Sequence, residues 1–319
     1  MRTAGARGRR KLSSPGRAIS LEVGGKTAFI TGGASGIGLG MAEAFTAAGM
    51  NVVIADLRQD HIANALAGFE DDGRSARVHA IELDVTDREG FARAADEAER
   101  VFGNVHVLCN NAGMGILGPV MQARYADWDW GLGVLIGGVI NGIQTFLPRM
   151  RAHGEGGFIV NTSSMAGVVP IPGAAIYITA KAALIGLSEA LRSELAAEGI
   201  VAAAFCPGPV ATNIREGGRL RPEEYGDSGY LELERDLEER PNSPAWMDPV
   251  ECGERVLEGI RRDDLYIFTH REFREGAEER FRAMLASFPD EPLNEERAKE
   301  ISFLLSNPIF STVLEQRTA

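Results

Sequence analysis

Cysteine and histidine are scarce and scattered in this sequence of 319 residues. Its three cysteines, Cys109, Cys206 and Cys252, lie far apart and form no C-x-x-C pair, which argues against a disulfide framework and against a zinc site. The five histidines are scattered and form no H-E-x-x-H pattern. We therefore expect no metal ion in the functional site.

Long apolar runs and an excess of positive charge are also missing. We count no apolar run of the ~18 residues that a membrane-spanning helix needs. The formal net charge of −12 disfavours nucleic acid and anionic membrane surfaces as partners. The first 18 residues are basic, but no apolar stretch follows them as it would in a secretory signal. These absences predict a cytoplasmic protein that binds neither nucleic acid nor membrane.

The basic segment 1–23 has the composition of a disordered tail, or it results from translation that starts at an upstream codon. A nucleic-acid-binding arm and a targeting peptide are the alternatives. We expect that its first 20 residues can be deleted without loss of activity, because they have no core to join.

Short apolar runs alternate with helical patterns from residue 26 onward. Hydrophobic residues make up 45% of the chain, enough for a large core. This alternation predicts βαβ units, and the unbroken apolar runs fit a sheet covered on both faces. We predict an α/β fold of the Rossmann type, a doubly wound parallel sheet. Its seven strands are expected within 26–31, 51–56, 76–85, 105–113, 156–164, 200–208 and near 266, with helices within 38–49, 61–70, 88–103, 126–152 and 174–199.

The predicted single domain covers residues 24–285. Within it, residues 213–248 are charged, rich in Gly and Pro and weakly periodic, which is typical either of a substrate lid or of a solvated insertion. Residues 286–319 carry one short apolar segment. We interpret them as an arm that packs against its own domain or a neighbouring subunit.

A glycine-rich turn, TGGASGIG at residues 31–38, follows the first predicted strand and opens the first helix. Glycines allow backbone N–H groups to approach a pyrophosphate, and the helix N-terminus favours its negative charge. The alternative is an ordinary strand-to-helix turn. The candidate cofactor-binding residues here are Gly32, Ser35, Gly36, Ile37 and Gly38.

The second predicted strand ends at Asp56, whose carboxylate can accept hydrogen bonds from the ribose hydroxyls of NAD and would repel the 2′-phosphate of NADP. No basic residue stands at Ala34 or Ser35, although Arg58 is near. We therefore expect NAD rather than NADP. The alternative for Asp56 is a turn residue after a strand.

Further motifs occur in a fixed order along the chain. LDVTD follows the third strand, NNAG (110–113) ends the fourth, Ser164 lies thirteen residues before Tyr177, Tyr177 and Lys181 form Y-x-x-x-K, and PGPVAT (207–212) follows the sixth strand. Over about residues 24–270 this set resembles the classical short-chain dehydrogenase/reductase family.

The resemblance implies a role for each matching position. Asp84 and Val85 would hold the adenine, and Asn111 would lie beside the adenine ribose. The nicotinamide would be lined by Pro207, Gly208, Val210 and Thr212. The 213–248 region corresponds to the variable substrate loop of the family.

The predicted catalytic residues are Ser164, Tyr177 and Lys181. One helical turn separates Tyr177 from Lys181, so they share a face. An ammonium group there would lower the pKa of the phenol and could hydrogen-bond the nicotinamide ribose. Ser164 would hold the substrate oxygen while Tyr177 removes the alcohol proton. The alternatives are a surface Tyr–Lys pair and a strand-end serine.

One position departs from the family. The helix that contains GVLIGGVING (133–142) usually carries an asparagine that holds a water linked to the lysine, and the ungapped match places Leu135 there. Asn141 lies six residues further and points to another face of a regular helix. We expect a weakened proton relay, or a leucine that merely packs.

Two segments, 218–230 and 265–281, resemble the bacterial dehydrogenases that oxidise the benzylic alcohol of lignin-type β-aryl ethers. This implies a bulky aromatic secondary alcohol, with stacking surfaces from Tyr225, Tyr230 and Trp246, although each could simply pack within the lid. We predict an NAD-dependent alcohol dehydrogenase or carbonyl reductase that assembles as a homodimer or homotetramer. The alternatives are a non-catalytic NAD(H)-binding sensor or scaffold, and an isomerase or dehydratase.

Overall fold

The computed structural model describes residues 22–318, so nearly all of the predicted tail at residues 1–23 lies outside the described residues. The centre is a seven-stranded sheet with the order β3-β2-β1-β4-β5-β6-β7, and every pair is parallel. The predicted Rossmann-type fold is confirmed. The strands are β1 (Thr27–Thr31), β2 (Asn51–Asp56), β3 (Val78–Glu82), β4 (Val105–Asn110), β5 (Gly157–Thr162), β6 (Ile200–Cys206) and β7 (Tyr266–Phe268).

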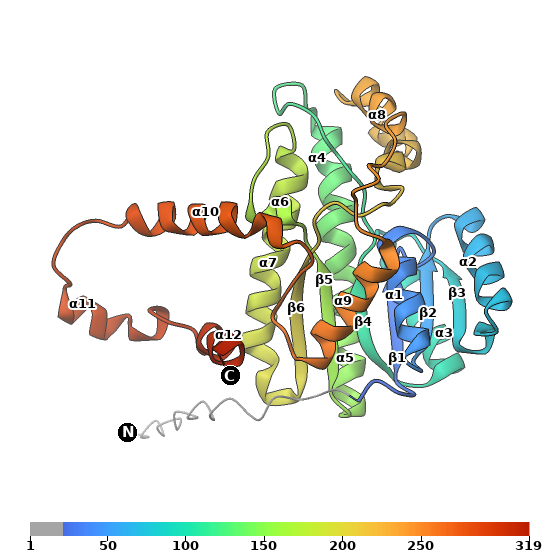
Figure 1. The fold of residues 1–319 in the computed structure, drawn as a ribbon, viewed down its shortest axis with the longest axis horizontal. Helices are drawn as coiled ribbons and strands as arrows, with labels where there is room; N and C mark the ends of the chain where they lie inside the picture. Colours follow the sequence, from blue (N-terminus) through green and yellow to red (C-terminus); the bar gives the residue numbers. More distant parts are fainter. Residues whose placement is uncertain (1–21, 319) are drawn as a thin grey trace, which may run out of the picture.

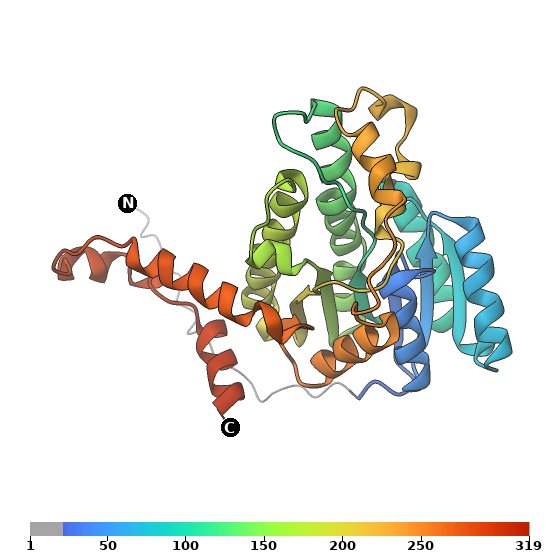
Figure 2. The ribbon, with the colours of Figure 1, turned by 45° about the horizontal axis from the view of Figure 1, so that its top comes forward.

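Helices cover both faces of this sheet (Figures 1 and 2). One face packs against α1 (Gly36–Ala47), α2 (Gln59–Asp71) and α9 (Pro249–Arg261), and the other against α3 (Arg88–Phe102), α5 (Gly138–His153) and α7 (Ala175–Leu195). Successive residues of a strand pack into the hydrophobic cores on opposite faces of the sheet. Ile30 packs on the α1 side and Phe29 on the α3 side, where its ring centroid lies 4.6 Å from that of Phe146. Two buried faces explain the unbroken apolar runs.

Helix α9 was not predicted, although the sequence carries its start signal. Asp248 caps the helix by accepting a hydrogen bond from the N–H of Val250 at 2.8 Å, and Pro249 occupies the first turn. Gly40 of α1 and Gly253 of α9 bring the two helices into backbone contact. A Cβ atom at Gly40 would lie 1.9 Å from the carbonyl oxygen of Pro249, so any larger residue would push α9 off the sheet.

The helix predicted over 126–152 is present in three parts: α4 (Tyr125–Leu132), a π-helical turn (Gly133–Gly137) and α5. Residues 130–147 carry no charged side chain. By length and composition, the helical stretch Tyr125–His153 could therefore cross a membrane, and the expectation that no apolar run is long enough was wrong. A helix that packs in a protein core passes the same test, and 44% of its most apolar window is buried here against the rest of the chain.

The 213–248 region folds over the carboxyl ends of the strands. It contains two 3₁₀ turns, η4 (Ile214–Leu220) and η5 (Glu223–Tyr225), and the helix α8 (Leu231–Glu238). Further short elements are α6 (Met165–Val168) and the 3₁₀ turns Ser75–Arg77, Ala196–Glu198, Arg271–Phe273 and Ser302–Leu304.

The C-terminal part of the chain projects from the body. It contains α10 (Arg274–Ala286), α11 (Glu295–Glu300) and α12 (Pro308–Thr318), and α12 returns to lie beside α7 (Figure 1). Many large apolar side chains of this segment are exposed: Phe281, Met284, Leu285, Phe288, Leu293, Phe303, Leu304, Leu305, Phe310 and Leu314.

Candidate active site

A cavity of about 410 Å³ opens at the carboxyl ends of the strands, where the strand order reverses between β1 and β4. Open α/β sheets bind their ligands at this switch point. The cavity wall contains all three predicted catalytic residues and every predicted cofactor-binding residue except Gly38.

The glycine-rich turn has the shape that a pyrophosphate site requires. Gly36 has a φ of +49°, in the left-handed region that disfavours other residues. Gly38 is pressed against the turn, because a Cβ atom there would lie 1.9 Å from the carbonyl oxygen of Gly32. Gly38 thus shapes the turn from behind the cavity wall, and the N-terminus of α1 faces the cavity. These features fit a dinucleotide phosphate.

Asp56, at the end of β2, is held by two backbone donors. The N–H of Ala34 lies 3.1 Å from one carboxylate oxygen, and the N–H of Arg58 lies 3.0 Å from the other. The residue is 8% exposed and lines the cavity. Both oxygens keep lone pairs that a ribose diol can use, so the fit to the adenosine half of the cofactor is good.

Asp84 and Val85 line the same end of the cavity. Asp84 accepts hydrogen bonds from the backbone N–H and the hydroxyl of Thr86, both at 2.8 Å. The carbonyl of Val85 accepts a hydrogen bond from the side-chain amide of Asn141 at 2.9 Å. Asn141 of α5 therefore braces the loop after β3, a contact that the sequence did not suggest.

The NNAG turn is tied to the first strand. Asn111 donates from its amide to the carbonyl of Thr31 at 3.1 Å, and the Thr31 hydroxyl accepts from the N–H groups of Asn111 and Ala112. Behind the turn, Asn110 donates to Asn161 of β5 at 2.9 Å. These bonds join β1, β4 and β5 beneath the cavity.

The three predicted catalytic side chains meet at the floor of the cavity. Ser164 lies two residues after β5 and caps α6, and it shares a hydrogen bond with Tyr177. The ammonium of Lys181, one turn along α7, donates to the carbonyl of Thr162 at 2.8 Å and lies 5.5 Å from the centre of the Tyr177 ring. The loop after β6 closes the site with Pro207, Gly208, Val210 and Thr212.

The electrostatics of this trio differ from the expectation. Burial raises the pKa of the Tyr177 phenol, and the hydrogen bond with Ser164 opposes that effect. The prediction that Lys181 lowers the pKa of Tyr177 is therefore wrong in direction for the chain by itself. It is the pKa of Lys181 that is lowered, to about 8, because burial removes water from its ammonium group.

Leu135 lies in the π-helical turn and is 1% exposed. It belongs to an apolar cluster with Met114, Trp130 and Ile176. Leu135 and Lys181 both lie beside Gly113. A Cβ atom built on Gly113 would lie 3.1 Å from a methyl carbon of Leu135 and 3.7 Å from the ammonium nitrogen of Lys181. The structure therefore places leucine carbon beside the lysine, where the family usually has an amide.

The substrate end of the cavity is aromatic and apolar. Two of the three predicted stacking residues line it, Tyr225 and Trp246. Tyr230 does not, because it is 1% exposed and its hydroxyl donates to the carbonyls of Gly118 and Pro119. The sequence interpretation missed several lining residues: Met114, Trp130, Leu220, Pro222 and Glu224.

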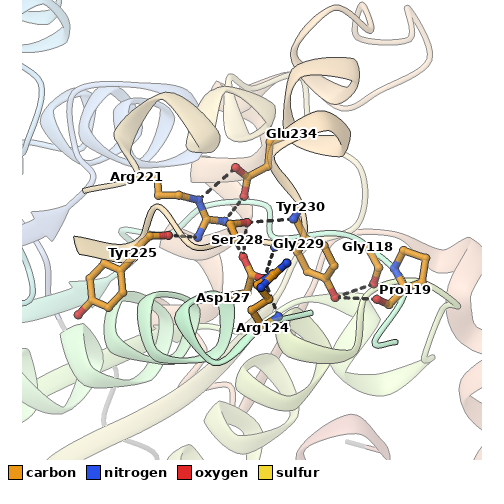
Figure 3. Close-up of polar contacts among 10 residues, drawn as sticks. All are labelled: Gly118, Pro119, Arg124, Asp127, Arg221, Tyr225, Ser228, Gly229, Tyr230 and Glu234. Carbon is orange, nitrogen blue, oxygen red and sulfur yellow. Dashed lines mark hydrogen bonds and ion pairs between the residues drawn. The ribbon is translucent and has the colours of Figure 1, made fainter. Parts of the chain in front are cut away.

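A buried polar network anchors the lid to α4 (Figure 3). The guanidinium of Arg221 lies between Asp127 of α4, at 3.0 Å, and Glu234 of α8. All three side chains are at most 5% exposed. Arg221 also covers the ring of Trp130, 4.2 Å from its centre. The network holds the 220–225 segment against the cavity.

The comparisons with known proteins agree with this architecture. The family model of the short chain dehydrogenases matches residues 26–222. A "C alpha-dehydrogenase" from Sphingobium sp. (strain NBRC 103272 / SYK-6) is 42% identical over 264 residues, which cover 82% of this chain and 86% of that protein.

Two solved structures are similar throughout. A short-chain dehydrogenase from Novosphingobium aromaticivorans has a TM-score of 0.77 and 36% identity, covering 92% of this chain and 99% of its own. One from Burkholderia phymatum, in complex with NAD, has a TM-score of 0.77 and 32% identity. The match covers 86% of this chain and 99% of that one. The resemblance to the classical family, and to its aryl-ether subgroup, is confirmed. The chain belongs to the short chain dehydrogenase family, whose members are oxidoreductases that use a nicotinamide dinucleotide.

Proposed function

We propose that the protein catalyses the NAD-dependent interconversion of a bulky, uncharged aromatic secondary alcohol and its ketone. One observation carries this proposal. Ser164, Tyr177 and Lys181 lie in a single cavity that runs from the carboxylate of Asp56 to the aromatic wall of the lid.

Each residue has a role that its position supports. The nicotinamide, when bound, supplies the hydride acceptor or donor. Ser164 hydrogen-bonds the substrate oxygen and orients it toward Tyr177. Tyr177 takes the hydroxyl proton during oxidation and returns it during reduction. Lys181, one turn along the same helix, is positioned to hydrogen-bond the nicotinamide ribose, and it is positively charged below its pKa of about 8.

The charges around the cavity favour a neutral substrate. Arg58 and Lys181 are the only arginine or lysine side chains among the described lining residues, against four carboxylates. Arg58 already pairs with Asp60 and Glu216. Among the described lining residues, Lys181 is therefore the only lysine or arginine not paired with a carboxylate, and it belongs to the catalytic floor, whereas Trp130, Tyr225 and Trp246 offer stacking surfaces. The aryl-ether resemblance supports a benzylic alcohol.

A direct test measures NADH absorbance with a panel of aryl alcohols and ketones, using NAD and NADP side by side. We expect turnover with benzylic secondary alcohols, and none with Tyr177→Phe, which should still bind NADH within a few-fold because only the proton-transfer oxygen is removed. Bound NADH without turnover of any alcohol or ketone would favour the sensor or scaffold alternative. Substrate conversion without net change in NADH would favour an isomerase or dehydratase.

The homodimer or homotetramer that the family resemblance implies is part of the same proposal. The exposed apolar side chains of the C-terminal helices are compatible with it, because large exposed apolar patches mark contact surfaces. Analytical ultracentrifugation measures the subunit number, and a monomer at assay concentration would contradict it.

A further inference from the structure

Arg58 lies where a 2′-phosphate would have to be recognised. Its backbone N–H donates to Asp56, the residue that we assign to the adenosine ribose, at 3.0 Å. A phosphate on the 2′ oxygen of that ribose would therefore come close to residue 58. The other lysine or arginine among the described lining residues, Lys181, belongs to the catalytic floor. Arg58 is thus the guanidinium available for NADP, and arginine is well suited to bind phosphate.

This guanidinium is already engaged on two sides. Its Nε and one Nη bond the two carboxylate oxygens of Asp60 at 3.0 and 2.6 Å. Its other Nη bonds a carboxylate oxygen of Glu216 at 2.9 Å. Both contacts raise the pKa of Arg58 and keep it fully charged. The two pairs differ in origin, because Asp60 lies on α2 beside Arg58, whereas Glu216 comes from η4 of the substrate lid.

The lid turn that carries Glu216 also reaches the catalytic half of the cavity. The carbonyl of Ile214 accepts a hydrogen bond from the N–H of Gly115 at 3.1 Å, just after the NNAG turn. Ile214, Glu216 and Gly217 all line the cavity. A movement of η4 would therefore alter the adenosine end and the substrate end together.

Building on the NAD preference of the proposed function, we propose that Glu216 is a cofactor-specificity residue carried by the substrate lid. It occupies the Nη of Arg58 that would otherwise bind a 2′-phosphate. NADP can bind only when this ion pair breaks, so that cofactor choice and lid position are coupled. Such coupling is reciprocal: a 2′-phosphate should loosen the lid as much as the closed lid weakens binding of the phosphate.

The test compares two probes that differ only in this group, adenosine 5′-monophosphate and adenosine 2′,5′-bisphosphate, by titration calorimetry without substrate. In the wild type we expect the bisphosphate to bind more weakly. Glu216→Gln should strengthen its binding relative to the monophosphate roughly threefold to tenfold, the range of a partly exposed charge contact. Glu223→Gln, the same change at an exposed lid position outside the cavity, should leave the ratio of the dissociation constants of the two probes unchanged.

A double-mutant cycle separates a pairwise effect from a general change in charge. In an Arg58→Gln background, Glu216→Gln should no longer change the ratio, because the group that it releases is gone. An unchanged ratio in Glu216→Gln alone, or a gain that persists in the Arg58→Gln background, would overturn this inference while leaving the proposed NAD preference intact. Equal binding of both probes by the wild type would overturn both.

Discussion

The side-chain amide of Asn141 donates a 2.9 Å hydrogen bond to the carbonyl of Val85. Asn141 comes from the first turn of α5, and Val85 lies in the loop that borders the adenine end of the cavity. Asn141, which we expected to point to another face than Leu135, therefore supports the loop at the cofactor end of the cavity.

Asn141→Ala should weaken NADH binding with little effect on kcat. The change leaves the Val85 carbonyl without this partner and frees the loop, which costs about 1–2 kcal/mol and corresponds to roughly a tenfold higher dissociation constant for NADH. Fluorescence titration of NADH checks this. Gln144→Ala, one turn further on the exposed side of α5, is the control. A loss of kcat at saturating NADH would place Asn141 in the catalytic step instead.

Asp56→Asn should shift the cofactor preference toward NADP. The substitution keeps the shape and the hydrogen-bonding oxygen but removes the charge that repels a 2′-phosphate. We expect the kcat/KM ratio of NADP to NAD to rise about tenfold or more, from steady-state assays with both cofactors. A wild type that prefers NADP would contradict the electrostatic argument.

Arg221→Met should loosen the lid. It leaves Asp127 and Glu234 buried without their cation, and an uncompensated buried charge costs about 3–5 kcal/mol. We expect the KM for an aromatic substrate to rise at least about tenfold and proteolysis within 213–248 to accelerate, while NADH binding changes little. Unchanged KM and unchanged proteolysis would show that the network does not position the lid.

Lys181 connects catalysis with stability. Burial lowers its pKa from 10.5 to about 8, so the folded protein binds fewer protons than the unfolded chain between these pH values. The free energy of unfolding therefore rises with pH across this window, and the buried charge destabilises the fold below pH 8.

Lys181→Met should abolish turnover and raise the free energy of unfolding at neutral pH. The lowered pKa of Lys181 corresponds to about 3 kcal/mol of destabilisation that the substitution removes. The variant also loses the hydrogen bond to Thr162, so we expect a net gain of about 1–3 kcal/mol in the free energy of unfolding. The gain should shrink as the pH approaches 10. Denaturant unfolding at several pH values checks this, with the exposed Lys299→Met as control. A pH-independent difference would contradict the assigned pKa.

Local patterns made most of the fold and much of the site predictable. Each strand was an apolar run, and motifs such as Tyr177 and Lys181 lie within one turn of a helix, where spacing alone fixes their relation. Contacts between distant segments were not predictable in this way. Arg58 and Glu216 are 158 residues apart, and Tyr230 resembled a stacking residue until the structure showed its hydroxyl bound to Gly118.

The pKa relation of Tyr177 and Lys181 failed for a related reason. Spacing predicted their proximity, but the direction of each shift depends on burial, which the surrounding elements decide. The expectation that no apolar run is long enough failed because polar residues without charge, such as Asn141 and Gln144, interrupt the apolar stretch of 130–147 without excluding it by composition.

Leu135 provides the last prediction. The leucine is buried in an apolar cluster beside Gly113 and Lys181, where the family usually has an asparagine that holds a water linked to the lysine. If this departure weakens the proton relay, Leu135→Asn should raise kcat several-fold at neutral pH, because Tyr177 already supplies the main acid–base group. The buried amide should also lower the free energy of unfolding by about 1–3 kcal/mol.

Leu135→Met separates these two effects, since it keeps an apolar side chain of similar volume and brings no amide. A rise in kcat for Leu135→Asn but not for Leu135→Met supports the relay. Unchanged or lower kcat in a folded Leu135→Asn variant means that Leu135 only packs. Because the π-helical turn sets the direction of this side chain, circular dichroism and thermal unfolding of both variants must first show that the helix is retained.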